Sequence, residues 1–323
     1  MIALVVRRLG VLVLTLLVTA ALSFALLHAA PGGPFDRERS VPPEVEAALA
    51  RHYGLDRPVL LDLEALGRGE LGRAFADTQL GRWLGGLLRG ELGPSLQHRG
   101  LAVEQLLAAG LPVSAAVGLL GLEVALVLGL GGGLLAAARH GRMADRLVRA
   151  AASAALAVPP FLLAVALALI FGLGLGWLPV AGWGQPRHLV LPALALGIPY
   201  GAVIARLVRS AVLEVLAEPF VRTARAKGLG GTAVLLRHAL RPALVPVVQY
   251  LGPLAAGLVT GSVAVETVFN LPGVGIHFVA GALNRDYPLV MGTVLLYAGS
   301  LLVLNALADL VALWLDPRGR QHG

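Results

Sequence analysis

The sequence predicts an all-α polytopic membrane protein with six transmembrane helices, and three observations lead there. The chain of 323 residues is 57% hydrophobic and 14% charged, and its mean hydropathy is +0.79, values typical of proteins that reside in a bilayer. A membrane-crossing helix needs about 20 apolar residues. Six such runs occur, at roughly 9–29, 111–137, 150–172, 189–208, 243–265 and 289–315. The charged residues lie mainly between the runs.

The runs differ in ways that bear on how they pack. The first run follows Arg7 and Arg8, as the apolar part of a signal peptide would. Its apolar stretch is too long for a signal peptide, and LLHAAPGG is a poor cleavage site, so we interpret it as a retained anchor. Gly129 and Gly133 in the second run form a small-xxx-small pair, which predicts close helix contact. Prolines interrupt the third and fourth runs, at Pro159, Pro160, Pro192 and Pro199. They fit a moving core with broken helices; simple tight packing explains them equally well.

Charge placement predicts the orientation of the spans. The segments 1–8, 138–149, 206–242 and 316–323 carry 15 Lys and Arg against 4 Asp and Glu, whereas 30–104, 177–188 and 270–288 carry 11 against 12. Basic loops face the cytoplasm. We therefore expect one transmembrane domain over 1–323, with both termini inside, an extracytoplasmic loop at 30–104 and a cytoplasmic loop at 206–242. The orientation of the loops therefore explains the net charge of +7, and we expect no nucleic acid as a partner.

The outer loop at 30–104 is the longest stretch of the chain outside the runs. A helix is expected near 43–52. The pentapeptide Arg-Gly-Glu-Leu-Gly occurs twice, at 68–72 and 89–93. The duplication is interpreted as a tolerated surface insertion.

Motifs for catalysis and cofactor binding are missing from the sequence. It contains no G-x-x-x-x-G-K-[ST], H-E-x-x-H or G-x-S-x-G. Its only lysine, Lys227, does not follow a glycine-rich loop. Cysteine is absent, and none of the eight histidines forms an i, i+4 pair. We therefore predict that the chain itself binds no ATP, cofactor or metal.

Three carboxylates fall within the apolar runs or directly at the end of one: Glu123, Glu266 and Asp309. A charge inside a membrane is costly, so each is a functional hypothesis by default. Glu266 and Asp309 lie near the ends of their runs, where water solvates them, and a structural role is favoured for both. Glu123 lies in mid-run without a basic residue nearby. It is the candidate for a polar translocation pathway.

The loop from 218 to 246, EPFVRTARAKGLGGTAVLLRHALRPALVP, is basic although long apolar runs flank it. Residues 211–227 are expected to form a helix that Pro219 kinks and Gly228 ends. A second helix from about 232 leads into the fifth run. Binding to anionic lipid headgroups would explain scattered arginines. The order of the residues favours a protein partner.

The loop resembles the cytoplasmic coupling loop of ABC-importer permeases, which reads Glu-Ala-Ala, three residues, Gly, nine residues, then Ile-x-Leu-Pro. Arg222, Thr223 and Ala224 stand at the first three positions, Gly228 matches the glycine, and Leu240 matches the leucine. The loop departs from this pattern in several places, including His238 at the Ile position and a proline one residue late, at Pro242. These departures are similar to the version of the motif found in the dipeptide/oligopeptide/nickel family. The resemblance implies that ATPase subunits dock at Arg222, Thr223, Ala224, Arg225, Lys227, Gly228 and Leu240.

The resemblance extends over nearly the whole chain and fits the B-type subunit of that family. Matching segments are LLHAAPGGP after the first arginines, Gly90 to Ser95, LPVAGWGQPRHLVLPALALG at 178–197, Glu266 to Gly275, Asn284 to Pro288, and Asp316 to Arg318. Glu123, Ala312 and the second RGELG unit depart from the family's usual pattern. From the C-terminal signature, the resemblance implies an outer gate that includes Glu266, Pro272, Gly273, Gly275 and Asp286.

The family implies an importer in the bacterial inner membrane. This chain would pair with a second homologous permease in contact with membrane lipid, two ATP-binding subunits that hold ATP and Mg, and an extracytoplasmic substrate-binding protein. Two alternatives are an intramembrane hydrolase that uses Glu123, Asp309 and a histidine, and a membrane scaffold without a pathway. Dipeptides, oligopeptides, glutathione-like thiols and nickel complexes all remain open as cargo.

Overall fold

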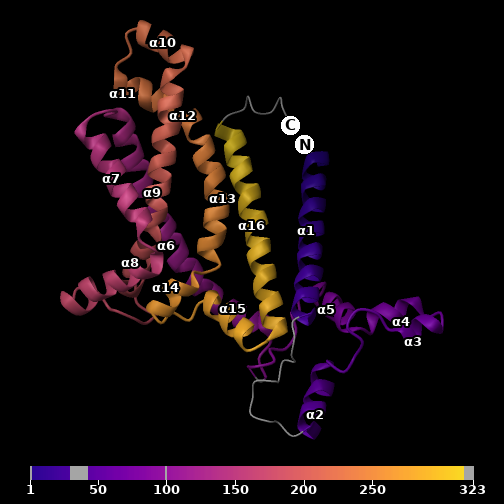
Figure 1. Ribbon diagram of the computed structural model, residues 1–323. Helices are drawn as coiled ribbons and strands as arrows, with labels where there is room; N and C mark the ends of the chain where they lie inside the picture. The colour runs from indigo at the N-terminus through magenta and orange to yellow at the C-terminus, as the bar shows by residue number, and fades with distance from the viewer. Residues whose placement is uncertain (1, 30–42, 99, 316–323) are drawn as a thin grey trace. The chain divides into compact units, whose positions relative to one another are not determined.

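The computed structural model describes residues 2–29, 43–98 and 100–315, which are mainly helical (Figure 1). Within these ranges there is no β-strand, and one isolated bridge joins Pro94 and Ala102. In chain order, with π-helices written η, the elements are α1 (Ile2–Ala29), α2 (Pro43–Tyr53), α3 (Leu63–Gly67), α4 (Leu71–Ala76), α5 (Gln79–Leu87), α6 (Val103–Ala138), α7 (Met143–Ala157), α8 (Pro160–Leu167), η1 (Ala168–Gly174), α9 (Arg187–Ala217), α10 (Pro219–Ala226), α11 (Gly231–Val234), η2 (Leu235–Ala239), α12 (Leu240–Ala243), α13 (Val245–Val259), α14 (Val263–Val268), α15 (Val274–Leu283) and α16 (Tyr287–Leu315).

The all-α prediction is confirmed. Five segments of the described chain are long and apolar enough to cross a membrane: Gly10–Ala29, Val103–Ala138, Arg187–Ala217, Val245–Val268 and Tyr287–Leu315. The third predicted run, 150–172, falls on a pair of helical segments, α7 followed by α8 with η1, bent by 98°. The total is six when this pair counts as one span.

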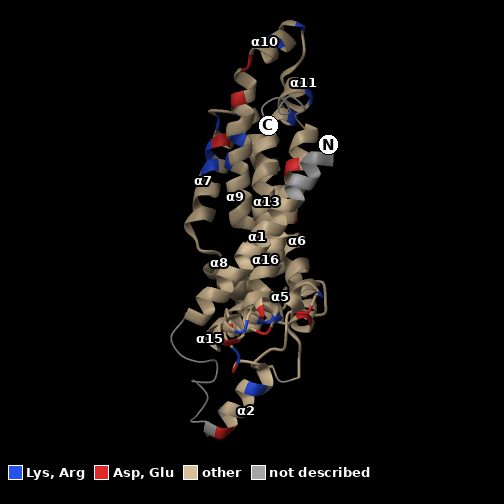
Figure 2. Ribbon diagram, turned by 90° about the vertical axis from the view of Figure 1, so that its right-hand side faces the viewer, with Lys and Arg blue, Asp and Glu red and all other residues tan. Residues whose placement is uncertain are grey.

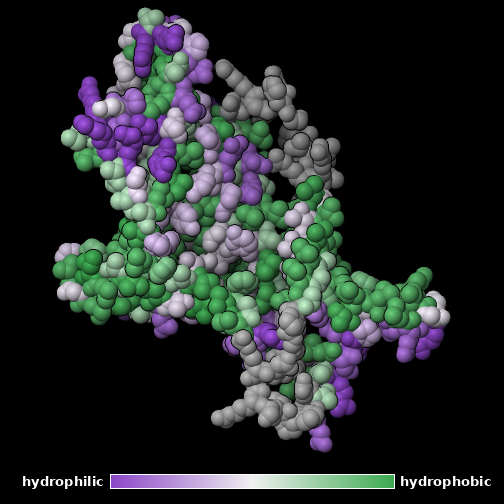
Figure 3. All heavy atoms as spheres, in the orientation of Figure 1, coloured by the Kyte–Doolittle hydropathy of each residue, from purple (hydrophilic) through white to green (hydrophobic). Residues whose placement is uncertain are grey.

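The bend between α7 and α8 follows from two consecutive prolines. A residue before proline is pushed out of the helical region. Val158 and Pro159 each precede a proline, and both are extended, with ψ angles of 119° and 142°. Pro160 then opens α8 as its first residue, where its missing N–H leaves no bond unmade. Figure 3 shows hydrophobic surface over α8 and η1.

In α9 the structure favours tight packing over a broken helix as the explanation for the prolines of the fourth run. Pro192 and Pro199 both lie inside one continuous helix from Arg187 to Ala217. Both prolines are buried. Packing on neighbouring helices can hold such a helix together, because other groups satisfy the carbonyl that each proline leaves without a donor.

Two compact units divide the chain: residues 1–111 with 274–299, and residues 112–273 with 300–323. The second unit contains the largest core, built mainly from α6, α8, α9, α13 and α14. α6 and α9 approach closely at glycines. A Cβ at Gly129 would lie 2.5 Å from the Cβ of Ile204, and one at Gly197 would lie 2.5 Å from the Cβ of Val124. The close contact predicted for Gly129 is therefore confirmed.

The first unit has its own smaller core, centred on Val103, Leu106, Leu107, Val274 and Leu289. It also contains the short helices α2 to α5. α2, at Pro43–Tyr53, confirms the helix expected near 43–52.

The two RGELG copies close two helices in the same way. Gly69 and Gly90 have φ of +77° and +80°, a left-handed conformation that favours glycine. The amide of Glu70 donates to the carbonyl of Ala65 at 3.0 Å, and the amide of Glu91 donates to that of Gly86 at 2.9 Å. Each copy is thus a helix stop, a structural role for the repeat.

Several sequence segments lie outside the described residues. They are the PGGP stretch and the rest of 30–42, and the C-terminal match at 316–318.

Candidate functional site

The coupling loop (residues 206–242) begins as the last turns of α9 and continues as a separate short helix. α9 ends at Ala217, Glu218 is extended with φ −66° and ψ 149°, and α10 begins at Pro219. The prediction of one kinked helix over 211–227 was wrong. Proline inside a helix removes a hydrogen bond, whereas proline at the first position removes none, so the chain starts a new helix there. Figure 1 shows α10 at one end of α9 and α11 close to the same end.

A small core holds the loop together. Val221 and Ala224 on α10 and Val234 on α11 are buried against one another, with Leu216 and Leu229 at the edge. Val221 and Ala224 are three residues apart and therefore share one face of α10. The loop is thus a packed body rather than an extended connection.

The opposite face of α10 presents polar side chains outward. Arg222, Thr223 and Arg225 are exposed, and so is Lys227 just after the helix. Figure 2 shows Lys and Arg gathered over α10 and α11. Four of the residues predicted to dock a partner therefore lie on one exposed basic surface. Ala224 does not: its side chain is 7% exposed and forms part of the small core.

Gly228 ends α10 in a turn that needs glycine for one reason. Its φ is +83°, and a Cβ there would meet no atom within 4 Å. The amide of Gly228 donates to the carbonyl of Arg225 at 2.9 Å. Backbone conformation, not lack of space, therefore selects glycine at this position.

The loop returns to the bundle through a π-helical segment. η2 (Leu235–Ala239) lies between α11 and α12 and is followed by Leu240, which is half-buried. π-helical turns are frequent at functional sites. Arg237 and His238 in this segment are exposed.

Arg241 links the exit of the loop to the end of α16, a contact that no sequence pattern indicated. Its Nε donates to the carbonyl of Leu315 at 3.0 Å, and one Nη donates to that of Trp314 at 3.0 Å. The guanidinium also lies 5.6 Å from the centre of the Trp314 ring. Carbonyls at a helix C-terminus lack partners within the helix, and an arginine satisfies them well.

Glu123 lies on the exposed face of α6. Leu119, Leu120 and Val127 are exposed on the same side. Among the described residues, no hydrogen bond or ion pair reaches its carboxylate. The side chain thus points out of this chain, toward whatever lies against α6.

Glu266 and Gly273, predicted as part of an outer gate, lie against each other. Glu266 is 2% exposed, and the hydroxyl of Ser114 donates to its Oε1 at 2.6 Å. A Cβ at Gly273 would collide with the carboxylate. Glu266 therefore ties α14 to α6, which supports the structural role favoured for it. Pro272, next to Gly273, is exposed.

Asp286 and Gly275 belong to the other unit and are both buried. The carboxylate of Asp286 accepts from the hydroxyl of Ser95 and from the amides of Gln97 and Leu289, at 3.3 Å for each amide. It thus connects the second RGELG region to the start of α16.

The same unit brings two histidines together. The rings of His98 and His277 lie edge to face, with centroids 6.1 Å apart. Burial lowers the pKa of His277, and the neighbouring His98 lowers it further. His277 is therefore mainly neutral near pH 7.

Comparison with solved structures defines the class of fold. A chain of the MetNI methionine ABC transporter, in an inward-facing conformation, superposes with a TM-score of 0.53 at 21% identity, over 66% of this chain and 97% of that chain. The protein therefore has the type I permease fold of ABC importers.

Sequence comparison then defines the family. Residues 129–321 match the family described as binding-protein-dependent transport system inner membrane component. The chain is 39% identical to the oligopeptide transport system permease protein OppB of Haemophilus influenzae, over 95% of each chain. It is 38% identical to OppB of Escherichia coli K12, over 99% of this chain and 100% of that one. It is 35% identical to the dipeptide transport system permease protein DppB of Bacillus subtilis, over 98% and 97%.

The chain belongs to this family of binding-protein-dependent transport permeases. Its relatives are named as permease proteins, which confirms the prediction of a transport subunit rather than an enzyme. The intramembrane hydrolase therefore has no support.

Proposed function

We propose that this chain is the permease subunit of an ATP-driven importer for peptides or related small solutes. The observation that carries the proposal is the exposed basic face of α10, which stands on its own small core at the family's coupling position. The curated relatives are named for oligopeptides and dipeptides, which supports peptides as the cargo class.

One of the importer's two cytoplasmic ATP-binding subunits docks on this face through Arg222, Thr223, Arg225, Lys227 and the Gly228 turn. The small core makes α10 move together with the end of α9, so closure of the ATPase subunits is transmitted to the spans. ATP and Mg are held by those subunits. A second homologous permease completes the pathway.

The permease lies in the inner membrane with both termini and the coupling loop in the cytoplasm. The charge difference between the two sets of loops supports this orientation. The chain has no cysteine, so a single one at position 230 is a clean probe. It should resist an impermeant thiol reagent in intact cells and react after lysis. Labelling in intact cells would reverse the orientation.

The extracytoplasmic loops contact a substrate-binding protein. They are 30–104, the segment with Trp177 and Trp183, and 270–288; both tryptophans are exposed. Crosslinks from these loops to the binding protein are expected. Crosslinks from the coupling loop alone would contradict this assignment.

The test of the function compares two glycines of the coupling loop. Both Gly228 and Gly230 have open space around the Cβ position, but φ is +83° at the first and −66° at the second. A left-handed conformation costs a leucine about 1–2 kcal/mol, so Gly228→Leu should shift the turn about 5- to 30-fold away from its native form. Substrate-stimulated ATP hydrolysis by the assembled importer should fall by a similar factor.

Gly230→Leu adds the same side chain without the backbone strain and should retain most of that activity. Membrane insertion should be normal in both variants. Wild-type stimulation in Gly228→Leu would refute the coupling role of the turn, and equal loss in both variants would assign the effect to side-chain bulk.

A further inference from the structure

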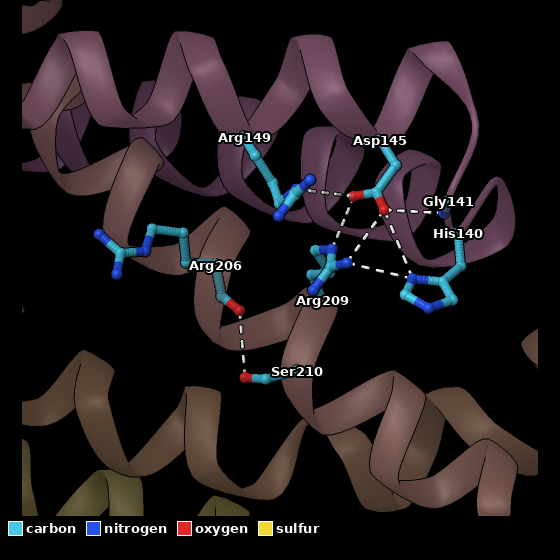
Figure 4. Close-up of polar contacts among 7 residues, drawn as sticks. All are labelled: His140, Gly141, Asp145, Arg149, Arg206, Arg209 and Ser210. Atoms are coloured by element: carbon cyan, nitrogen blue, oxygen red, sulfur yellow. Dashed lines mark hydrogen bonds and ion pairs between the residues drawn. The ribbon is translucent and has the colours of Figure 1, made fainter.

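A buried ion pair joins α7 and α9 near one end of each helix (Figure 4). The side chain of Asp145 is 1% exposed. Arg209 donates to it twice, from Nε at 2.7 Å and from Nη2 at 2.9 Å, and the amide of Gly141 donates at 2.9 Å. The carboxylate is thus fully engaged.

Beside this pair, α7 and α9 line an open, groove-shaped cavity of about 720 Å³ that has an excess of positive charge. Arg149, Arg206 and Arg209 line it, with the hydroxyls of Ser153 and Ser210, and no carboxylate does. Arg149 is 55% exposed and reaches Asp145 only at 3.6 Å. Arg206 is exposed and makes no ion pair with a described carboxylate. In Figure 4 its guanidinium points away from Asp145.

The other part of the same cavity is apolar. Leu156 of α7 and Val203 of α9 line it. Leu156 lies seven residues after Arg149 on one helix, which corresponds to about 10 Å along the axis. Both helices belong to segments apolar enough to cross a membrane. The cavity therefore passes from a cationic end to a hydrocarbon-like end along the direction of the helices.

We propose that this groove binds an anionic glycerophospholipid. Arg149 and Arg206 hold its phosphate, the serine hydroxyls donate to the phosphate oxygens, and an acyl chain lies along Leu156 and Val203. Guanidinium groups match phosphate geometry with paired donors. The excess positive charge disfavours a headgroup that carries its own cation. The proposal requires only that the chain lies in a membrane, so it is independent of the cargo and of the ATPase partners.

The test uses the full chain purified with the subunits that accompany it. The protein is incubated with phosphatidylglycerol or with phosphatidylcholine of the same acyl chains, and retained lipid is counted by native mass spectrometry. Removing one arginine at the membrane surface should weaken binding about fivefold, and removing both, in Arg149→Gln with Arg206→Gln, about 25-fold. Arg206→Lys, which keeps the charge, should restore part of the binding.

The matched control is Arg146→Gln. Arg146 is exposed on the same helix one turn away and does not line the cavity, so retention should stay near that of the wild type. If Arg146→Gln lost as much phosphatidylglycerol as the cavity variants, binding would reflect the general positive charge of this surface and not a defined site. Equal retention of phosphatidylcholine, or displacement by inorganic phosphate, would overturn the anionic lipid as the ligand. A third outcome would also overturn the proposal: the groove crosslinks to the second permease and retains no phosphatidylglycerol, so a protein and not a lipid occupies it.

Discussion

The α6–α9 helix pair and the coupling loop both depend on glycine, but for opposite reasons. At Gly129 and Gly197 a Cβ would lie only 2.5 Å from a valine or isoleucine Cβ of the facing helix. At Gly228 nothing lies within 4 Å, and the requirement is a φ of +83°. The helix pair needs glycine for close approach, and the loop needs it for a turn. A change at one should therefore damage folding, and a change at the other should damage coupling.

The largest effect is expected in the helix pair. A Cβ at Gly133 would lie 2.7 Å from the carbonyl oxygen of Ala205 and from the Cβ of Val208. Gly133→Leu should therefore destabilise the permease by at least about 1–3 kcal/mol, the usual cost of overpacking. We expect little folded protein in detergent extracts, measured by size-exclusion chromatography and thermal unfolding.

Gly131→Leu is the control for this prediction. Gly131 lies on the same helix, and a Cβ there meets no atom within 4 Å. A folded yield as low as that of Gly133→Leu would contradict the packing argument.

An intermediate effect is expected in the small core of the coupling loop. Val234→Asp places a carboxylate at a position that is 0% exposed in the native chain. Burying an unpaired polar group costs about 1–3 kcal/mol and a charged group costs more, enough to open this core while the spans stay folded. Substrate-stimulated ATP hydrolysis should be lost, with thermal stability close to that of the wild type.

Thr232→Asp adds the same charge at an exposed position of α11 and should leave stimulation nearly intact. If Val234→Asp lowered thermal stability as strongly as Gly133→Leu, the small core of the loop would contribute to the stability of the whole permease, and the loop would not be a separate folding element.

The smallest effect is expected at Glu123, which shares α6 with Gly121 but lies about 200° around the helix from it. Glu123→Gln keeps the size and removes the charge. We propose that the carboxylate faces the translocation pathway or the second permease, so transport by the assembled complex should fall several-fold without loss of stability. A carboxylate against lipid would cost at least about 2.5 kcal/mol. Wild-type transport and assembly in both Glu123→Gln and Glu123→Leu would make the residue incidental.

Much of the fold could be predicted because membrane helices are encoded by long local runs. The six runs, the helix at 43–53 and the close approach at Gly129 all depend on composition and spacing along a single segment. The exposed basic residues of α10 could be predicted for the same reason.

Other features depended on backbone alternatives or distant partners. Pro219 could kink a helix or open one, and only the structure distinguished them. Ala224 was predicted to dock a partner because of its place in the motif, but it packs inward against Val234, which lies across the loop. Two contacts join residues far apart in sequence: Asp145 with Arg209, and Arg241 with the end of α16. No local pattern could predict them.

The repeated helix stop has a consequence for how the length of the 30–104 segment can vary. Each RGELG copy brings a glycine in the left-handed conformation and its own closing hydrogen bond, so each helix terminates without help from the next. A segment of this kind can be gained or lost as a unit, because the residues that end a helix travel with it. The length of this segment can therefore change in whole-helix steps without disturbing the helices that remain.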